Sequence, residues 1–225
     1  MNTLSPTDVL VSTRESLHRV AEHVLAAALN RASGQFALRP APGGFATPPL
    51  PDGTVLGVHG TDLVVTRDED VRRTRLTTVR EAAAFAGTEP GYPTGDSPPA
   101  TPFEPDTPLT LDAHAAAVLA DWYALGDLTL LRWAAQIEPD GPSEALLYPE
   151  HFDLGSSAAQ VNYGFSPGDT AIELPYLYVG PWAGAPVADD FWNAGFGAYR
   201  TVEQVEDIEA ALGFLREAHD RLRTR

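Results

Sequence analysis

The sequence has no cysteine, no lysine and no long apolar run among its 225 residues. The lack of cysteine excludes disulfides, thiolate metal sites and a thiol nucleophile. All 15 basic residues are arginines, so a Schiff-base lysine, a lysine general base and a lysine-dependent phosphate loop are excluded as well. We attribute the preference for arginine to a GC-rich genome rather than to function. Every apolar run is shorter than the ~20 residues that cross a bilayer.

Charge and the N-terminal residues narrow the class of protein further. The net charge of −16 and the pI near 4.6 argue against binding to nucleic acid or to anionic membranes, because both partners require a basic surface. The opening segment, MNTLSPTDVL, lacks the basic and apolar regions of a secretory signal. We therefore expect a cytoplasmic protein that binds neither nucleic acid nor membrane.

The composition that is present is that of an ordinary globular chain. Hydrophobic residues make up 44% and charged residues 20%, and the length suits a single domain over residues 1–225. The segment 89–108 is exceptional because it holds seven prolines in 20 residues, a composition that excludes regular helix. Long structureless segments are unusual inside compact domains. We predict a proline-rich connecting arm at 89–108 that lacks helix and strand and packs through Phe103.

Helices and strands follow from hydrophobic periodicity and from capping or turn signals. We expect helices at 6–32, 79–86, 110–137 and 202–223, with Gly126 dividing the third. Thr78 and Thr201 open capping boxes for the second and fourth. The expected strands are 35–39, 54–58, 62–66, 71–77, 146–154, 160–165, 172–179 and 191–199.

The order of these elements indicates the fold class. The strands occur in runs with short turns rather than alternating with helices, which favours antiparallel pairing. The predicted fold is α+β, with antiparallel β-meanders packed against long helices. A long helix followed by a meander occurs twice, so two similar α-plus-meander halves are an open alternative, although no residue-level identity links them.

A histidine and a carboxylate interrupt the second meander at 144–182. If the strand at 146–154 is regular, His151 and Asp153 point to one face, because side chains alternate along a strand. Such a pair can ligate a metal or act as a base and its orienter. Structural hydrogen bonding is the competing explanation, and the spacing fixes no third ligand.

Aromatic side chains crowd the same meander. Small-molecule pockets combine apolar and aromatic walls with a few convergent polar groups. We take His151, Asp153, Asn162, Tyr176 and Tyr178 as candidate ligand-binding residues, and the first two also as candidate metal ligands. Core packing, with the tyrosine hydroxyls at its rim, is the alternative explanation for most of the aromatic residues.

The histidines outside the meander are not candidates. His18 and Glu22 have the spacing of an ordinary pair on a helix surface. His23 comes five residues after His18 and makes a poor metal partner for it. No nucleophile elbow or phosphate loop is visible in the sequence.

Three segments of the second meander have recognisable counterparts. They are LYPEHFD at 147–153, NYGFSPGD at 162–169 and PYLYVGPW at 175–182. These segments resemble a protein family from actinobacteria whose members tend to have tryptophan where this chain has Tyr148. The resemblance supports a cytoplasmic protein from a GC-rich bacterium, and it implies no activity because none is known for the family.

Three functions are compatible with these patterns. The first is a cytoplasmic binding protein whose pocket lies beside the 145–182 meander and takes a small, partly apolar ligand. The second is a metal-assisted or acid–base enzyme that uses His151 and Asp153. The third is a module that binds a partner through the proline-rich arm. The sequence identifies no cofactor and leaves the oligomeric state open.

Overall fold

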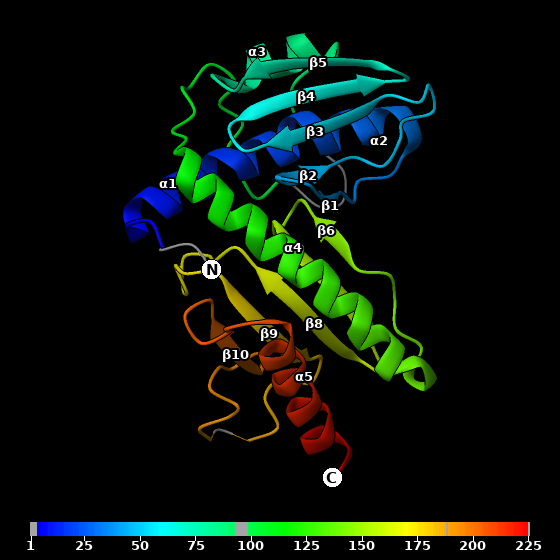
Figure 1. Cartoon of the computed structure of the whole chain (residues 1–225), viewed down its shortest axis with the longest axis vertical. Coiled ribbons are helices and arrows are strands. Elements are labelled where there is room, and N and C mark those ends of the chain that lie inside the picture. The colour runs from blue at the N-terminus through cyan, green and yellow to red at the C-terminus, as the bar shows by residue number, and fades with distance from the viewer. Residues whose placement is uncertain (1–3, 93–98, 188, 225) are drawn as a thin grey trace. The chain divides into compact units, whose positions relative to one another are not determined.

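The computed structural model describes residues 4–92, 99–187 and 189–224. It shows an α+β fold with two antiparallel five-stranded sheets (Figure 1), which confirms the predicted fold class. The chain divides into two compact units. The first unit consists of the residues up to Asp121 together with Leu147–Phe152. The second unit consists of Trp122–Leu146 and the residues from Asp153 onward.

A long N-terminal helix opens the first unit. It consists of α1 (Thr7–Val20), a π-helical turn η1 (Ala21–Ala26) and α2 (Ala27–Ser33). Gly34 ends the helix in the left-handed conformation with φ of +74°, which glycine adopts without steric cost. The helix predicted at 6–32 is therefore confirmed, with a wide turn in its middle that the sequence did not indicate.

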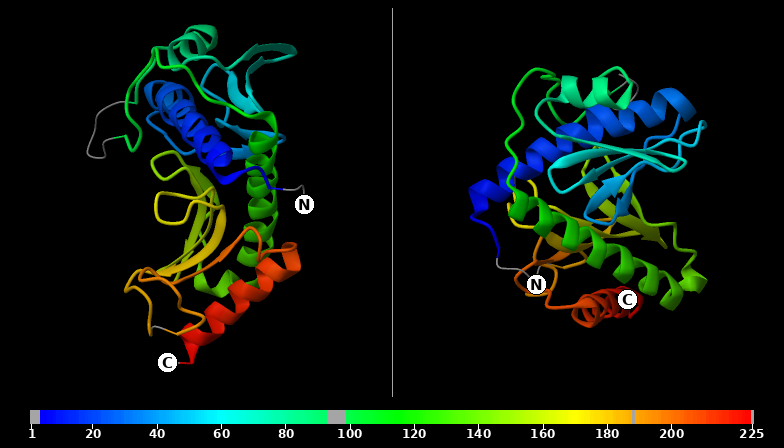
Figure 2. Two further views of the ribbon diagram at one scale, coloured as in Figure 1. Left: turned by 90° about the vertical axis from the view of Figure 1, so that its left-hand side faces the viewer. Right: turned by 45° about the horizontal axis from the view of Figure 1, so that its top comes forward.

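The first sheet joins its strands strictly in chain order, β1-β2-β3-β4-β5, and every pair is antiparallel. Alternate residues are buried, as on β4, where Leu63 and Val65 lie in the core. Figure 2 (right) shows the N-terminal helix along one side of this sheet. The strands are β1 (Arg39–Ala41), β2 (Gly44–Ala46), β3 (Val55–His59), β4 (Asp62–Arg67) and β5 (Asp70–Arg75).

A short helix, α3 (Val79–Ala86), follows the first sheet. The Thr78 side chain accepts a hydrogen bond from the Glu81 backbone N–H at 3.1 Å, so the predicted N-cap is confirmed. The proline-rich arm comes next. Its described residues contain no helix or strand, as predicted, whereas positions 93–98 lie outside the described residues.

The next helix, α4 (Ala113–Gln136), runs without interruption from the first unit into the second. The prediction that Gly126 divides it was wrong. A Cβ at Gly126 would lie 2.7 Å from the Phe165 ring and 3.0 Å from Leu154. The glycine therefore permits close approach of the sheet to the helix, and the packing of that helix outweighs the ~1 kcal/mol propensity cost of glycine.

The second sheet has the order β10-β9-β8-β7-β6. The strand predicted at 146–154 was wrong, because residues 149–152 form a turn and the chain pairs again only from Asp153. Ala159 and Gln160, both with positive φ, then make a tight hairpin into the next strand. The strands are β6 (Leu146–Tyr148), β7 (Asp153–Ala158), β8 (Val161–Ser166), β9 (Tyr176–Pro181) and β10 (Ala198–Thr201).

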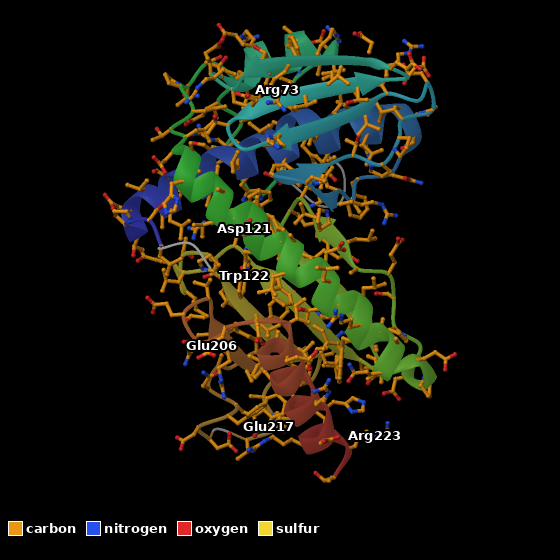
Figure 3. The ribbon with its side chains drawn as sticks, in the orientation of Figure 1. Arg73, Asp121, Trp122, Glu206, Glu217 and Arg223 are labelled. Carbon is orange, nitrogen blue, oxygen red and sulfur yellow. The ribbon has the colours of Figure 1, made fainter. Side chains whose placement is uncertain are left out.

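Helices cover one face of the second sheet, as Figure 2 (left) shows for α4 and α5. Trp122 of α4 (labelled in Figure 3) packs on Phe165 with ring centroids 5.0 Å apart and donates its indole N–H to the Ser166 carbonyl at 2.8 Å. Trp133, further along α4, packs edge-on against Tyr163. This helix-covered face is the core of the second unit.

The C-terminal segment departs from the predictions in two places. The strand expected at 191–199 is displaced to β10. Thr201 belongs to that strand rather than capping a helix, and the Gln204 side chain accepts its backbone N–H at 2.9 Å. The last helix, α5 (Ile208–Arg223), is capped instead by Asp207, which accepts the Ala210 backbone N–H. No helix among the described residues is long and apolar enough to span a membrane.

Candidate functional site

The second sheet turns one face away from the helices, and we call it the tyrosine face. Its positions follow from strand register, because residues paired across neighbouring strands point to the same side. Tyr178 pairs with Gly164 on one side and with Tyr199 on the other. The positions of the face on β7–β10 are Asp153, Gly155, Ser157, Asn162, Gly164, Ser166, Tyr176, Tyr178, Gly180, Tyr199 and Thr201.

Four of the five candidate ligand-binding residues therefore share this face. They are Asp153, Asn162, Tyr176 and Tyr178, and they come from three strands. The face includes two tyrosines, Tyr176 and Tyr178, whose hydroxyl groups bond to aspartates, and none of its positions is an arginine. Residues separated by up to 25 positions in the chain are thus gathered on one surface by the meander.

Each of two tyrosines on this face donates its hydroxyl to an aspartate. Tyr178 reaches across β8 to Asp153, and it can do so because Gly164 lies beneath its ring, where a Cβ would come within 2.5 Å. Tyr176 donates to Asp169 at 2.7 Å. Burial, followed by the hydrogen bond to Asp169, raises the pKa of Tyr176 above its usual range. The Tyr176 phenol is therefore a fixed proton donor.

Aromatic rings surround these two pairs. Phe196, from the segment before β10, lies with its centroid 6.4 Å from the rings of Tyr176, Tyr178 and Tyr199. Tyr176 and Tyr199 are 5.8 Å apart, edge to face. Phe196 is 42% exposed, so this aromatic group is accessible at one end.

Asn162 links the tyrosine face to an exposed indole. Its side-chain oxygen accepts the Trp182 indole N–H at 2.9 Å and the Ser157 hydroxyl at 2.8 Å. Trp182 is 66% exposed. Trp182 was among the aromatic residues of this meander that the sequence suggested could line a pocket, although it was not one of the five named ligand-binding candidates.

His151 is placed differently from the other four candidates. It is exposed in the turn between β6 and β7, where its backbone N–H donates to the Tyr148 carbonyl at 3.3 Å. Phe152, between His151 and Asp153, has φ of +53°, which is not a strand conformation. The prediction of one regular strand through His151 and Asp153 was therefore wrong, and alternation does not bring the two side chains to one face. Among the described residues, no group of three or more histidines and carboxylates is arranged to hold a metal ion.

The main polar contacts that the sequence did not reveal lie in the π-helical turn. Glu22 and His23 are buried, so the reading of Glu22 as half of a surface pair was wrong. The Glu22 carboxylate accepts the backbone N–H groups of Ala100 and Thr101 at 2.7 and 2.8 Å, and the Thr101 hydroxyl at 2.5 Å. These bonds hold the proline-rich arm against the N-terminal helix.

His23 fixes the other side of the arm. Its Nδ1 accepts the Tyr92 backbone N–H at 3.2 Å, so its ring proton is on Nε2, which lies 3.2 Å from the Thr101 carbonyl. The Phe103 ring packs 5.3 Å from the His23 ring while remaining 51% exposed, which agrees with the predicted packing of the arm through Phe103. The sequence signal was the pair Glu22-His23 inside an otherwise apolar run from Val20 to Leu29.

His18 is also engaged rather than solvent-exposed. Its Nε2–H donates to the Pro149 carbonyl at 2.6 Å, and its ring stacks on Phe152 at 5.0 Å. Burial lowers the pKa of His18 below its usual value near 6.5, and the nearby charge of Glu22 opposes this shift in part. Burial therefore favours the neutral form of the His18 ring.

Comparisons of the chain with protein-family models, with curated proteins and with solved structures gave no significant match.

Proposed function

We propose that the protein binds a small molecule on the tyrosine face of its second sheet. The observation that supports this most directly is the gathering of Asp153, Asn162, Tyr176 and Tyr178 on the one face that α4 and α5 leave uncovered. Aromatic surface with a few ordered polar groups is the usual chemistry of a small-molecule site.

The charges of the face favour a cationic ligand with an apolar body. Two aspartates lie among tyrosine and phenylalanine rings, and the face positions include no arginine. A cation over an aromatic face gains ~0.5–2 kcal/mol from the ring quadrupole. The net charge of −16 favours the approach of such a ligand as well.

Benzylamine is a suitable first probe, with benzyl alcohol and benzoate as neutral and anionic counterparts of the same shape. We expect benzylamine to shift the indole N–H NMR signal of Trp182, assigned with the Trp182→Phe variant, and to bind more tightly than either counterpart. Tyr178→Phe removes the hydroxyl that orients Asp153 but keeps the ring. It should weaken benzylamine binding by about tenfold, the equivalent of ~1.4 kcal/mol.

Tyr163→Phe is the matched control, because Tyr163 is on the neighbouring strand and on the opposite, helix-covered face. This variant should bind benzylamine as the wild type does. Equal binding by wild type and Tyr178→Phe, or no benzylamine response at millimolar concentration, would contradict a cation site on the tyrosine face. Tighter binding of benzyl alcohol would retain a ligand site there and reject its preference for cations.

The cytoplasmic location and the membership of the actinobacterial family stay predictions. The structure gives less support to the other two functions, an enzyme that uses His151 and Asp153 and a module that binds a partner through the arm. His151 is exposed in a turn, and the arm is bonded to Glu22 and His23 of its own chain.

A further inference from the structure

The first sheet carries a hollow of about 240 Å³ on its own uncovered face. Strand register accounts for its position, because Ala46, Gly57, Val64 and Arg73 pair side by side across four strands. The buried residues Leu63 and Val65 point to the other side of the sheet. Gly57 has no side chain, so the sheet is recessed at the centre of this row.

The lining of the hollow is mainly apolar, with one permanent cation at its edge. Val55 and Val64 form part of the walls, and His59, Thr66 and Arg73 supply polar groups. Figure 3 labels Arg73 on the first sheet. The volume of the hollow is below the ~300–1,000 Å³ of sites for drug-sized ligands, so its occupant must be a small molecule.

Arg73 is available for a ligand. Its side chain is 53% exposed, and its guanidinium approaches Asp62 only at 3.8 Å, near the limit of an ion pair. Exposed pairs of this kind contribute ~0–1 kcal/mol. An arginine guanidinium presents two parallel N–H groups that match the two oxygens of a carboxylate. A carboxylate can therefore compete for Arg73 at little cost.

We propose that this hollow is a second binding site, which takes a small monocarboxylate with an apolar body. The apolar part lies in the recess over Gly57 and between Val55 and Val64, and the carboxylate accepts two hydrogen bonds from Arg73. At physiological salt, charges farther from the hollow than the ~8 Å screening length are largely screened, so the acidic net charge of the chain opposes an anion there only weakly. The contact with Arg73 therefore decides binding at this position. The site is independent of the tyrosine face because none of its residues belongs to the second sheet.

Benzoate is the probe, with benzyl alcohol as the neutral counterpart, and binding is measured by calorimetry and by backbone NMR shifts on the full chain. We expect benzoate to bind the wild type and to shift signals of β3, β4 and β5, with benzyl alcohol at least tenfold weaker. Arg73→Gln should lower the affinity for benzoate at least tenfold.

Arg72→Gln is the matched control, since it removes the same charge from the adjacent residue. Arg72 lies over the Phe85 ring at 5.1 Å and does not line the hollow. It should leave benzoate affinity within twofold of wild type. Gly57→Val tests the recess separately. A Cβ at Gly57 would meet Ala46 at 3.4 Å, an ordinary contact, so the variant should fold and lose benzoate binding.

Three results would overturn the proposal. They are equal benzoate affinity in wild type and Arg73→Gln, full retention of binding in Gly57→Val, and no binding at 10 mM (roughly −2.7 kcal/mol on the usual affinity scale). Tyr178→Phe, which tests the tyrosine face, should leave benzoate binding unchanged. Failure of one site therefore leaves the other site's result intact.

Discussion

At the scale of single residues, glycines decide where side chains can reach. Gly164 provides the space over which the Tyr178 ring crosses β8 to meet Asp153. A glycine in a central strand costs conformational entropy and offers no packing, so its position here is explained by the close approach of the ring.

Gly164→Ala should therefore destabilise the protein by about 1–3 kcal/mol, the range for overpacking a well-filled site. Urea unfolding measures the loss. Gly213→Ala is the control, because Gly213 is an exposed position inside α5 with no atom within 4 Å of an added Cβ. That substitution should stabilise the protein by ~0.5–1 kcal/mol. Unchanged stability for Gly164→Ala would mean that Tyr178 does not lie over β8.

A second residue-scale prediction concerns His18. Because burial lowers its pKa in the folded protein below the value near 6.5, the unfolded chain binds a proton at higher pH than the folded chain does. The contribution of His18 to stability is complete above about pH 6.5 and is lost progressively as the pH falls through the lower, folded pKa. Acid should therefore destabilise the wild type through this histidine.

His18→Gln isolates that contribution. Glutamine can still donate to the Pro149 carbonyl but does not titrate. We expect the free energy of unfolding to fall less steeply between pH 7 and pH 5 in the variant than in the wild type, because the variant lacks the titration of His18. The carboxylates are the same in both proteins, so their contribution cancels in the comparison. Identical slopes in chemical denaturation would show that His18 is equally protonated in the folded and unfolded states.

At the scale of elements, the π-helical turn and the proline-rich arm form one polar assembly. Glu22 accepts three hydrogen bonds from the arm, and hydrogen bonds to charged groups are worth ~1.5–3 kcal/mol each. π-Helical turns widen a helix by one residue and are frequent at functional sites. Here the π-helical turn contains Glu22 and His23, the two consecutive residues that hold the arm.

Glu22→Ala should release the arm while the remainder of the fold persists. Limited proteolysis should then cut within 89–108 at least tenfold faster than in the wild type, a change equivalent to ~1.4 kcal/mol in the opening equilibrium. Glu104→Ala is the control, because Glu104 is also a carboxylate of this region but makes only a 3.7 Å ion pair with Arg19. Equal cleavage rates in wild type and Glu22→Ala would show that these bonds do not hold the arm.

The sequence predicted elements well where local chemistry determines them. The capping threonine at 78 is a local signal, and its prediction was confirmed. Gly126 was misread because its role depends on Phe165, a residue of another element. Thr201 matched a capping box but pairs as a strand residue in β10, so tertiary pairing outweighed the local pattern.

The candidate site shows the same division. Alternation along β9 was enough to group Tyr176 with Tyr178, whereas Asn162 joins them only through the register of β8 against β9. The grouping of His151 with Asp153 depended on a strand that bends at Phe152, where a positive φ gives no signal in the residue type. Glu22 and His23 were missed because the spacing of a regular helix does not describe a π-helical turn.

At the scale of the whole molecule, the two units differ in their spectroscopic content. All four tryptophans, at positions 122, 133, 182 and 192, belong to the second unit. The N-terminal helix and the first sheet have none. Tryptophan fluorescence therefore follows the unfolding of the second unit, whereas far-UV circular dichroism follows the helices of both.

We expect the two signals to give one coincident urea transition, as the prediction of a single domain requires. The physical reason is α4, which is continuous across the division and has buried residues on both sides of it, Leu119 before and Trp122 after. Coincident transitions are a test of two-state unfolding. A fluorescence midpoint separated from the circular dichroism midpoint would show two domains that unfold independently.

The strictly sequential strand order of both sheets has a kinetic consequence. Each hydrogen-bonded strand pair joins neighbours in the chain, so each hairpin closes only a short loop, and loop-closure entropy grows with loop length. Sheets of this kind can grow by adding one strand at a time and fold faster than sheets with distant pairings. In the first unit, the backbone bridge between Leu38 and Leu147 joins residues that are far apart in the chain. That bridge should form late, after both meanders, and its closure would complete the native structure.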